Sequence, residues 1–205
     1  MLEASHLECV RGNRTIFSDV SFAVRPGDCF RLTGPNGSGK SSLLRMLCGL
    51  LSPSNGTIQW QGAGIQTLGE EYFSSIAYVG HRPGIKDEFS AIENLQISSG
   101  LSGIGISRKA AVCALERMGL GCRMHLAVRF LSEGERRRAA LARLVVGRSS
   151  LWLLDEVLTS LDRMAVETIQ RLIDDHLAAG GMAIVATHQE LKLASCRSQR
   201  IELAA

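Results

Sequence analysis

The run Gly34-Pro35-Asn36-Gly37-Ser38-Gly39-Lys40-Ser41 is the strongest indication of fold in this chain. It fits the pattern G-x-x-x-x-G-K-[ST], in which glycines let backbone N–H groups turn toward phosphates with no Cβ in the way. The apolar stretch 29–33 before it predicts a buried strand, and the stretch 42–47 after it predicts a helix closed by Gly49. Strand, glycine loop and helix place a helix N-terminus beneath the phosphates, which predicts a nucleotide site. The alternative is a glycine-rich turn in some other α/β protein.

The residues of this loop have separate expected roles. The ammonium group of Lys40 can reach the β- and γ-phosphates of a nucleoside triphosphate, and the hydroxyl of Ser41 can ligate Mg²⁺. The predicted nucleotide-binding residues of the loop are Gly34, Pro35, Asn36, Gly37, Ser38, Gly39, Lys40, Ser41 and Ser42.

The composition is that of a globular protein with one core, or a core with a subdomain. Of 205 residues, 45% are apolar and 21% charged, and a net charge of +3 is too small to indicate a nucleic-acid partner. No apolar run approaches the roughly 20 residues of a membrane-spanning helix, and the N-terminal residues do not read as a signal peptide. The six cysteines form no C-x-x-C and no metal-site spacing, so we expect free, mostly buried thiols in a reducing cytosol.

The pattern along the chain changes twice. Residues 1–80 predict mainly strands around the one helix after the glycine loop, and residues 151–204 predict strand and helix alternation. Between them, helices are expected over 109–118 and 135–146, with a loop over 98–107. The basic run Arg136-Arg137-Arg138 is expected on a solvated helix face.

A second element of a hydrolysis site follows the apolar run Leu151-Trp152-Leu153-Leu154, which predicts a strand buried on both faces. Asp155 at the tip of this strand can hold Mg²⁺, directly or through water, opposite the Ser41 hydroxyl. The adjacent Glu156 can polarise the attacking water. The alternative is that Asp155 caps a following helix and that Glu156 is a surface residue.

Two further positions are also suited to contact a nucleotide phosphate. His188 ends the predicted strand 182–187, where an imidazole can contact a γ-phosphate, although a single histidine is usually structural. Ser132 is a plausible helix N-cap, with Glu135 at the capping-box position. By itself that is an ordinary helix start; with the other elements it suggests a helix N-terminus aimed at a phosphate.

The ordered motifs GPNGSGKS, LSEGE, LWLLDE, SLD and TH resemble those of the ATP-binding subunits of ABC transporters, over essentially the whole chain. The resemblance implies an α/β P-loop NTPase fold of the ABC type, with a RecA-like core sheet, an antiparallel β lobe and an inserted helical subdomain. It implies one domain over residues 1–205, composed of a β lobe and P-loop core (1–80), a linker and helical subdomain (81–147) and the rest of the core (148–205).

The same resemblance implies a head-to-tail homodimer that holds two ATP molecules with Mg²⁺. In that family the signature turn, here Ser132 and Gly134, serves the nucleotide of the opposite subunit, and Asp162 would lie across the interface. Lys40, Glu156 and His188 would be the catalytic residues. His81 stands where the family usually has a glutamine that faces the membrane partner, and it is a possible further metal contact.

Within the family, the run Tyr78-Val79-Gly80-His81-Arg82-Pro83-Gly84-Ile85-Lys86 resembles the linker of the haem exporter ATPases of cytochrome c maturation. This implies an ATPase on the cytoplasmic face of the bacterial inner membrane, bound to integral membrane subunits and acting indirectly on a periplasmic haem chaperone, with no nucleic acid involved. The alternatives are the ATPase of another small exporter for lipid, peptide or metal, a soluble factor that acts on ribosomes or DNA, and a non-hydrolysing subunit.

Three departures from the family pattern carry expectations. Glu133 and Glu135 place carboxylates in the signature turn, so we expect weakened capture of ATP across the dimer. Val157 replaces a common proline, which would loosen the turn that holds the catalytic glutamate. No aromatic residue lies near 9–12 to stack on adenine; either Arg11 stacks on the base, or the base is barely held.

Overall fold

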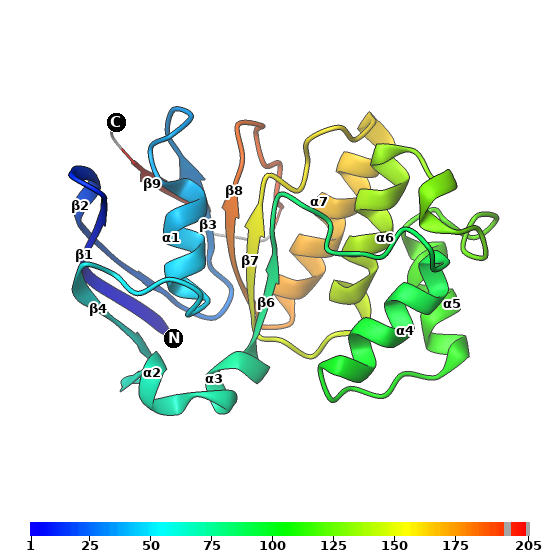
Figure 1. Ribbon diagram of the computed structural model, residues 1–205, viewed down its shortest axis with the longest axis horizontal. Coiled ribbons are helices and arrows are strands. Elements are labelled where there is room, and N and C mark those ends of the chain that lie inside the picture. The colour runs from blue at the N-terminus through cyan, green and yellow to red at the C-terminus, as the bar shows by residue number, and fades with distance from the viewer. Residues whose placement is uncertain (195–197, 204–205) are drawn as a thin grey trace. The chain divides into compact units, whose positions relative to one another are not determined.

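The computed structural model describes residues 1–194 and 198–203. Its strands are β1 (Leu2–Arg11), β2 (Arg14–Val24), β3 (Cys29–Thr33), β4 (Asn55–Trp60), β5 (Ala63–Gly64), β6 (Ile76–Val79), β7 (Leu151–Asp155), β8 (Met182–Ala186) and β9 (Ser198–Glu202). Its helices are α1 (Lys40–Leu47), α2 (Ile65–Leu68), α3 (Glu70–Ser75), α4 (Ala91–Leu101), α5 (Arg108–Arg117), the 3₁₀ turn η1 (Val128–Phe130), α6 (Glu133–Val146) and α7 (Arg163–Ala178) (Figure 1).

The chain divides into two compact units. The first contains Met1–Tyr78, Ser149–Glu156 and the residues from Ile173 onward, and the second contains Val79–Arg148 and Val157–Leu172. The second unit thus contains α4, α5 and α6 together with Val157–Leu172, a segment that the sequence assigned to the rest of the core.

The first unit contains two sheets. One is antiparallel, in the order β2-β1-β4-β5, and the other has the order β6-β7-β8-β3-β9, with β3 parallel to β8 and β9 and β7 parallel to β8. Every residue of β7 and β8 is buried, as expected for strands covered on both faces. The α/β fold with an antiparallel lobe is therefore confirmed.

Helix α1 contributes to the core that both sheets of this unit share. Leu43, Leu44 and Leu47 are fully buried and belong to one apolar cluster with residues of β1, β3, β7 and β8. Burial of each leucine side chain contributes about 2 kcal/mol. The helix ends before Gly49, which has a φ of +73° and donates its N–H to the Met46 carbonyl, as the sequence predicts.

The second unit is built on α4, α5 and α6, which pack against one another (Figure 1). Each begins at a serine whose hydroxyl accepts a hydrogen bond from a backbone N–H of the first turn: Ser90, Ser107 and Ser132. Ser90 and Ser132 each form a full capping box, so the predicted box of Ser132 with Glu135 is confirmed.

Several local predictions were wrong. Helix α4 continues to Leu101 because Ser99 is buried in its packing, so the expected loop begins later than residue 98. The short helices α2 and α3 interrupt a region expected to be mainly strands. The cysteines, by contrast, are mostly buried as expected: Cys9, Cys29 and Cys48 are buried and free, whereas Cys113 and Cys122 are exposed; Cys196 lies outside the described residues.

The expected solvated face at the basic run of α6 was also wrong. Arg137 is only 5% exposed. The guanidinium of Arg136 donates to the carbonyls of Val128, Arg129 and Leu131, and that of Arg138 donates to those of Met118 and Gly119. These arginines hold neighbouring loops of the second unit, because backbone carbonyls that lack helix or strand partners are strong acceptors.

Candidate functional site

The glycine loop connects β3 to α1 within the first unit. Gly39 is the N-cap of α1 with a φ of +95°, and no side chain caps the helix. The first N–H groups of α1 therefore have no side-chain acceptor and can receive an anion, which the helix dipole also favours. The predicted order of strand, loop and helix is confirmed.

Two glycines of the loop have no room for a side chain. A Cβ on Gly34 would lie 2.5 Å from Oγ of Ser38, and a Cβ on Gly39 would lie 2.7 Å from the side chains of Ile16 and Phe17. Both residues also have a φ in the positive region. The loop can keep this path only with glycine at these two positions.

Lys40 is held by the loop itself. Its Nζ donates to the carbonyl oxygens of Gly34, at 2.8 Å, and Pro35, at 3.1 Å, and the residue is 8% exposed. A lysine ammonium has three donors, so the loop orients the group with two of them and one donor remains for a phosphate oxygen.

A cavity of about 410 Å³ in the first unit brings half of the predicted site residues together. Its lining consists of Arg11, Ile16, Asn36, Gly37, Gly39, Lys40, Ser41, Ser42, Asp155 and Glu156. The volume lies within the range of small-molecule sites. Cationic and hydroxyl groups lie on the loop side of this lining, and carboxylates come from the end of β7.

Asp155 and Ser41 supply the oxygen atoms that a hard cation prefers. Asp155 is the last residue of β7 and is 2% exposed, and both residues line the cavity. A buried carboxylate beside a hydroxyl fits Mg²⁺, which binds through one or two carboxylates plus substrate phosphates. The residue that caps the next helix is Asp162, whose Oδ1 accepts from the N–H of Ala165 at 2.7 Å.

Glu156 has an unusual backbone conformation for its residue type. Its φ is +52°, and its N–H donates to the carbonyl of Ala186 at the end of the neighbouring strand β8. Nε2 of His188 lies 3.5 Å from its Oε1. A non-glycine residue in the left-handed region is uncommon and often marks a functional position.

The remaining predicted residues belong to the second unit. Ser132 caps α6, and a Cβ on Gly134 would lie 3.1 Å from the carbonyl of Ser160, so the loop that ends at Asp162 lies against the first turn of α6. The chain thus gathers Lys40, Ser41, Asp155, Glu156 and His188 in one unit, and Ser132, Gly134 and Asp162 in the other. His81 belongs to the second unit and is exposed.

The two carboxylates of the signature turn differ in their surroundings. Glu135 accepts a hydrogen bond from the N–H of Ser132 at 2.8 Å and lies 3.2 Å from Nε of Arg123. The hydrogen bond from the Ser132 backbone is the main reason that the pKa of Glu135 is lowered. Glu133 is exposed. The carboxylate of Glu135 is therefore engaged by the N-terminus of α6 and by Arg123, whereas the carboxylate of Glu133 is open to solvent.

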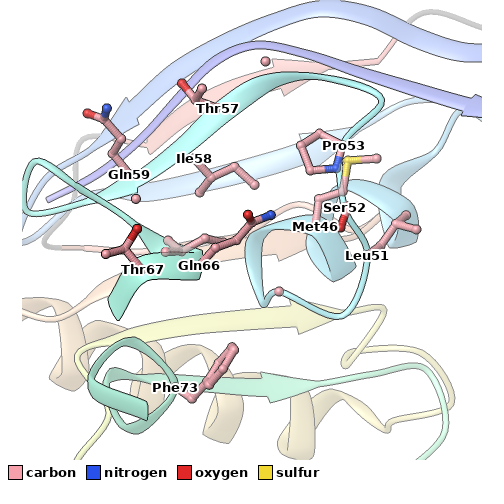
Figure 2. A pocket seen from close by; sticks show the side chains of 14 residues that line it. Met46, Leu51, Ser52, Pro53, Thr57, Ile58, Gln59, Gln66, Thr67 and Phe73 are labelled. Carbon is pink, nitrogen blue, oxygen red and sulfur yellow. The ribbon is translucent and has the colours of Figure 1, made fainter. Parts of the chain in front are cut away.

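A second pocket, of about 260 Å³, lies in the first unit and was not predicted from the sequence (Figure 2). It is bounded by the end of α1, the strands β4 and β5, and the helices α2 and α3, with Met46, Leu51, Ile58, Ile65 and Phe73 among its lining residues. None of the lining residues is charged, so this pocket has no side chain that would attract a phosphate. This pocket could not be predicted because two of the helices that bound it, α2 and α3, were not predicted.

Neither a ready-made metal cluster nor a membrane-spanning helix is present within residues 1–194 and 198–203. No three His, Cys, Asp or Glu side chains of these residues come together as a metal site. None of the helices in this part of the chain has the length and apolar character needed to span a bilayer.

The fold and the cavity define a nucleotide-binding subunit of the ABC class. The family model described as ABC transporter matches residues 17–159, and the chain belongs to this family. It is 50% identical over 202 residues to a protein of Nitrosospira multiformis, with 98% of both chains covered. That protein is named cytochrome c biogenesis ATP-binding export protein CcmA.

Solved structures have the same fold. A putative ABC transporter ATP-binding protein from Pyrococcus furiosus matches with a TM-score of 0.85 at 22% identity, covering 98% of this chain and 96% of that one. An ATP-binding cassette that forms a dimer in a post-hydrolysis state with ADP and phosphate matches with a TM-score of 0.81 at 22% identity. That match covers 92% of this chain and 88% of the other.

Proposed function

We propose that this chain is the ATP-hydrolysing subunit of an ABC haem exporter that serves the biogenesis of c-type cytochromes. The main support for ATP hydrolysis is the cavity beside the phosphate loop, which is lined by Lys40, Ser41, Asp155 and Glu156. The main support for the biological role is the 50% identity, over 98% of both chains, to a protein named for cytochrome c biogenesis and export.

The phosphates of ATP would be held by the loop and α1. The backbone N–H groups of residues 36–41 surround them, and the positive end of α1 favours their charge. Lys40 would give up its hydrogen bonds to the carbonyls of Gly34 and Pro35 for stronger, charge-assisted bonds to phosphate oxygens. Because the ammonium is already oriented, little side-chain entropy is lost on binding.

Ser41 and Asp155 would hold Mg²⁺, which when bound neutralises charge on the phosphates. The buried carboxylate and the hydroxyl line the same cavity, and both are oxygen donors suited to this cation. An imidazole is a poor ligand for Mg²⁺, so we assign His81 to the membrane partner rather than to the metal.

Glu156 orients the attacking water and accepts its proton as the water oxygen bonds to the γ-phosphorus. The bond from the γ-phosphorus to the bridging oxygen breaks, and ADP and phosphate leave. His188, at 3.5 Å from the Glu156 carboxylate, holds that carboxylate in place and contacts the γ-phosphate. These steps rest on position and charge stabilisation and need no covalent enzyme intermediate.

A second copy of the chain would complete each site. Ser132 and Gly134 at the N-terminus of α6 would contact the γ-phosphate held by the partner copy, and Asp162 would lie at the same interface. The dimer of a related cassette with ADP and phosphate supports this arrangement. The exposed Glu133 opposes the phosphate charge, which weakens but does not abolish capture.

The dimer would act on integral membrane subunits from the cytoplasmic face of the inner membrane. ATP closes the two copies, hydrolysis separates them, and the change of interface drives the membrane partner to release a haem-loaded periplasmic chaperone. A name that includes export, in the relative that is 50% identical, supports a membrane partner.

The test is deletion of the gene in its natural host, scored by covalent haem in c-type cytochromes. Loss of covalent haem, with rescue by the natural chain and no rescue by Lys40→Ala, is the expected result. Covalent haem that persists after deletion would contradict the biological role. Full rescue by Lys40→Ala, at equal protein level, would contradict the need for ATP hydrolysis.

A further inference from the structure

Residues 80–86, here called the linker strap, are held at both ends by side chains of helices in the second unit. Near the start of the strap, Nη2 of Arg137 donates to the carbonyl oxygen of His81 at 3.2 Å. At its end, Oδ1 of Asn94 accepts from the N–H of Lys86 at 2.7 Å, and Nδ2 donates to the Lys86 carbonyl at 2.9 Å. The two anchors come from α6 and α4.

Both anchoring side chains are buried, although both are polar. Arg137 is 5% exposed and Asn94 is 8% exposed. A guanidinium does not lose its charge in a protein, and a buried charge is tolerated only where acceptors satisfy it. The carbonyl of His81 is one such acceptor. The path of the strap and the burial of Arg137 therefore depend on each other.

The middle of the strap is partly exposed, with Pro83 and Ile85 half-buried. Arg82 and Gly84 are exposed, and Gly84 has a φ of +67° with open space where a Cβ would stand. The strap is therefore held near its ends by hydrogen bonds, and Arg82 and Gly84 are accessible between these anchors.

Arg137 lies on the second turn of α6, the helix that begins at the Ser132 cap. We propose that Arg137 and Asn94 are positioning residues that make the linker strap and the signature turn move as one body. The inference rests on the proposed function in one respect: the strap is taken to face the membrane subunit and the signature turn to face the ATP of the second copy. A membrane partner that moves the strap would then move the signature turn with it.

The neighbouring Arg138 provides a matched control. It lies on the same helix, has the same side chain and donates to backbone carbonyls, but its acceptors are Met118 and Gly119. Arg137→Met and Arg138→Met each remove a guanidinium and keep similar apolar volume. A difference in behaviour between the two variants is therefore due to the lost contact with the strap, because both variants lack one arginine of α6.

The first test measures cleavage of the purified chain by endoproteinase Lys-C after Lys86, at the end of the strap. Loss of a charge-assisted hydrogen bond should make Arg137→Met about tenfold more rapidly cleaved there than the natural chain. Arg138→Met should stay within about twofold of the natural chain, and Arg137→Lys, which keeps a cation, should be partly protected. Asn94→Asp, which keeps the acceptor and loses the donor, should also be cleaved faster. Equal cleavage of Arg137→Met and Arg138→Met would overturn the assignment.

The second test measures ATPase activity of the exporter complex. Arg137→Met should lose most of the stimulation by the membrane subunits while the basal rate of the isolated chain stays within about twofold; Arg138→Met should keep the stimulation. Full stimulation of Arg137→Met would show that the strap does not carry the coupling. The cleavage test needs neither ATP nor a membrane partner, so it separates failure of this inference from failure of the proposed function.

Discussion

Nε2 of His188 lies 3.5 Å from Oε1 of Glu156, although the two residues are far apart along the chain. Each follows the end of a buried strand, Glu156 after β7 and His188 two residues after β8, and the two strands are parallel neighbours. The carboxyl ends of adjacent parallel strands lie at one edge of a sheet, which is where α/β proteins place their sites.

Removal of the imidazole should therefore disturb chemistry more than binding. We expect His188→Ala to lower the steady-state rate of ATP hydrolysis by about a hundredfold and to leave ATP affinity within a few fold. His188→Gln, which keeps a hydrogen-bond donor, should lose less. Nucleotide binding and phosphate release measured on all three chains check this. A rate for His188→Ala equal to that of the natural chain would rule out a role in hydrolysis.

The two glycines at 37 and 39 make a paired test of the phosphate loop. Gly37 has a φ of +86° with open space where a Cβ would stand, so Gly37→Ala should cost about 1 kcal/mol of unfolding free energy. Gly39→Ala adds a collision with Ile16 and Phe17, and should cost at least about 2 kcal/mol and abolish ATP binding. Urea unfolding and nucleotide titration distinguish the two. Similar losses of unfolding free energy and of ATP binding in the two variants would argue against a collision of the new methyl group with Ile16 and Phe17.

The buried imidazole of His176 should make the free energy of unfolding decrease in acid. It stacks on Trp152 with ring centroids 3.8 Å apart and planes 5° from parallel. Burial lowers its pKa from the ordinary value of 6.5, opposed in part by hydrogen bonds to the backbone of Met182 and Ser150. Between the lowered pKa and 6.5 the unfolded chain binds more protons than the folded chain, so stability falls as the pH falls below about 6.5.

Chemical unfolding of His176→Phe at a series of pH values tests this. The phenyl ring can keep the stack and cannot bind a proton, so the loss of stability between about pH 7 and pH 5 should be smaller than in the natural chain. His125→Gln, which changes an exposed histidine, should show the same pH dependence as the natural chain. An unchanged slope in His176→Phe would place the acid sensitivity elsewhere.

Much of this site could be predicted from the sequence because its parts are local. The glycine loop, the apolar strand before Asp155 and the capping box of Ser132 each depend on a few consecutive residues. The contact of Arg137 with His81 and that of Glu135 with Arg123 could not be predicted, because in each pair the two residues come from separate segments of the chain. The stack of Trp152 on His176 could not be predicted for the same reason, because the two residues lie far apart in the sequence.

The base of the nucleotide has a candidate contact in Arg11, which lines the cavity with Ile16. If its guanidinium stacks on the purine, Arg11→Ala should weaken ATP and GTP binding alike, by about fivefold or more, because every purine presents a π face. Arg11→Lys, which keeps the charge and loses the planar group, should weaken both nearly as much. Affinities unchanged by Arg11→Ala would dismiss this contact and leave the phosphates as the main source of affinity.

The most direct measurement of the central claim is ATP binding and ATP turnover of Glu156→Gln, compared with the natural chain in the same exporter complex. The amide keeps the shape of the carboxylate and cannot accept the proton of the attacking water. We predict that ATP binding is retained and that turnover falls by about a hundredfold or more. Full turnover in Glu156→Gln would contradict the assignment of Glu156 and, with it, the account of hydrolysis at this cavity.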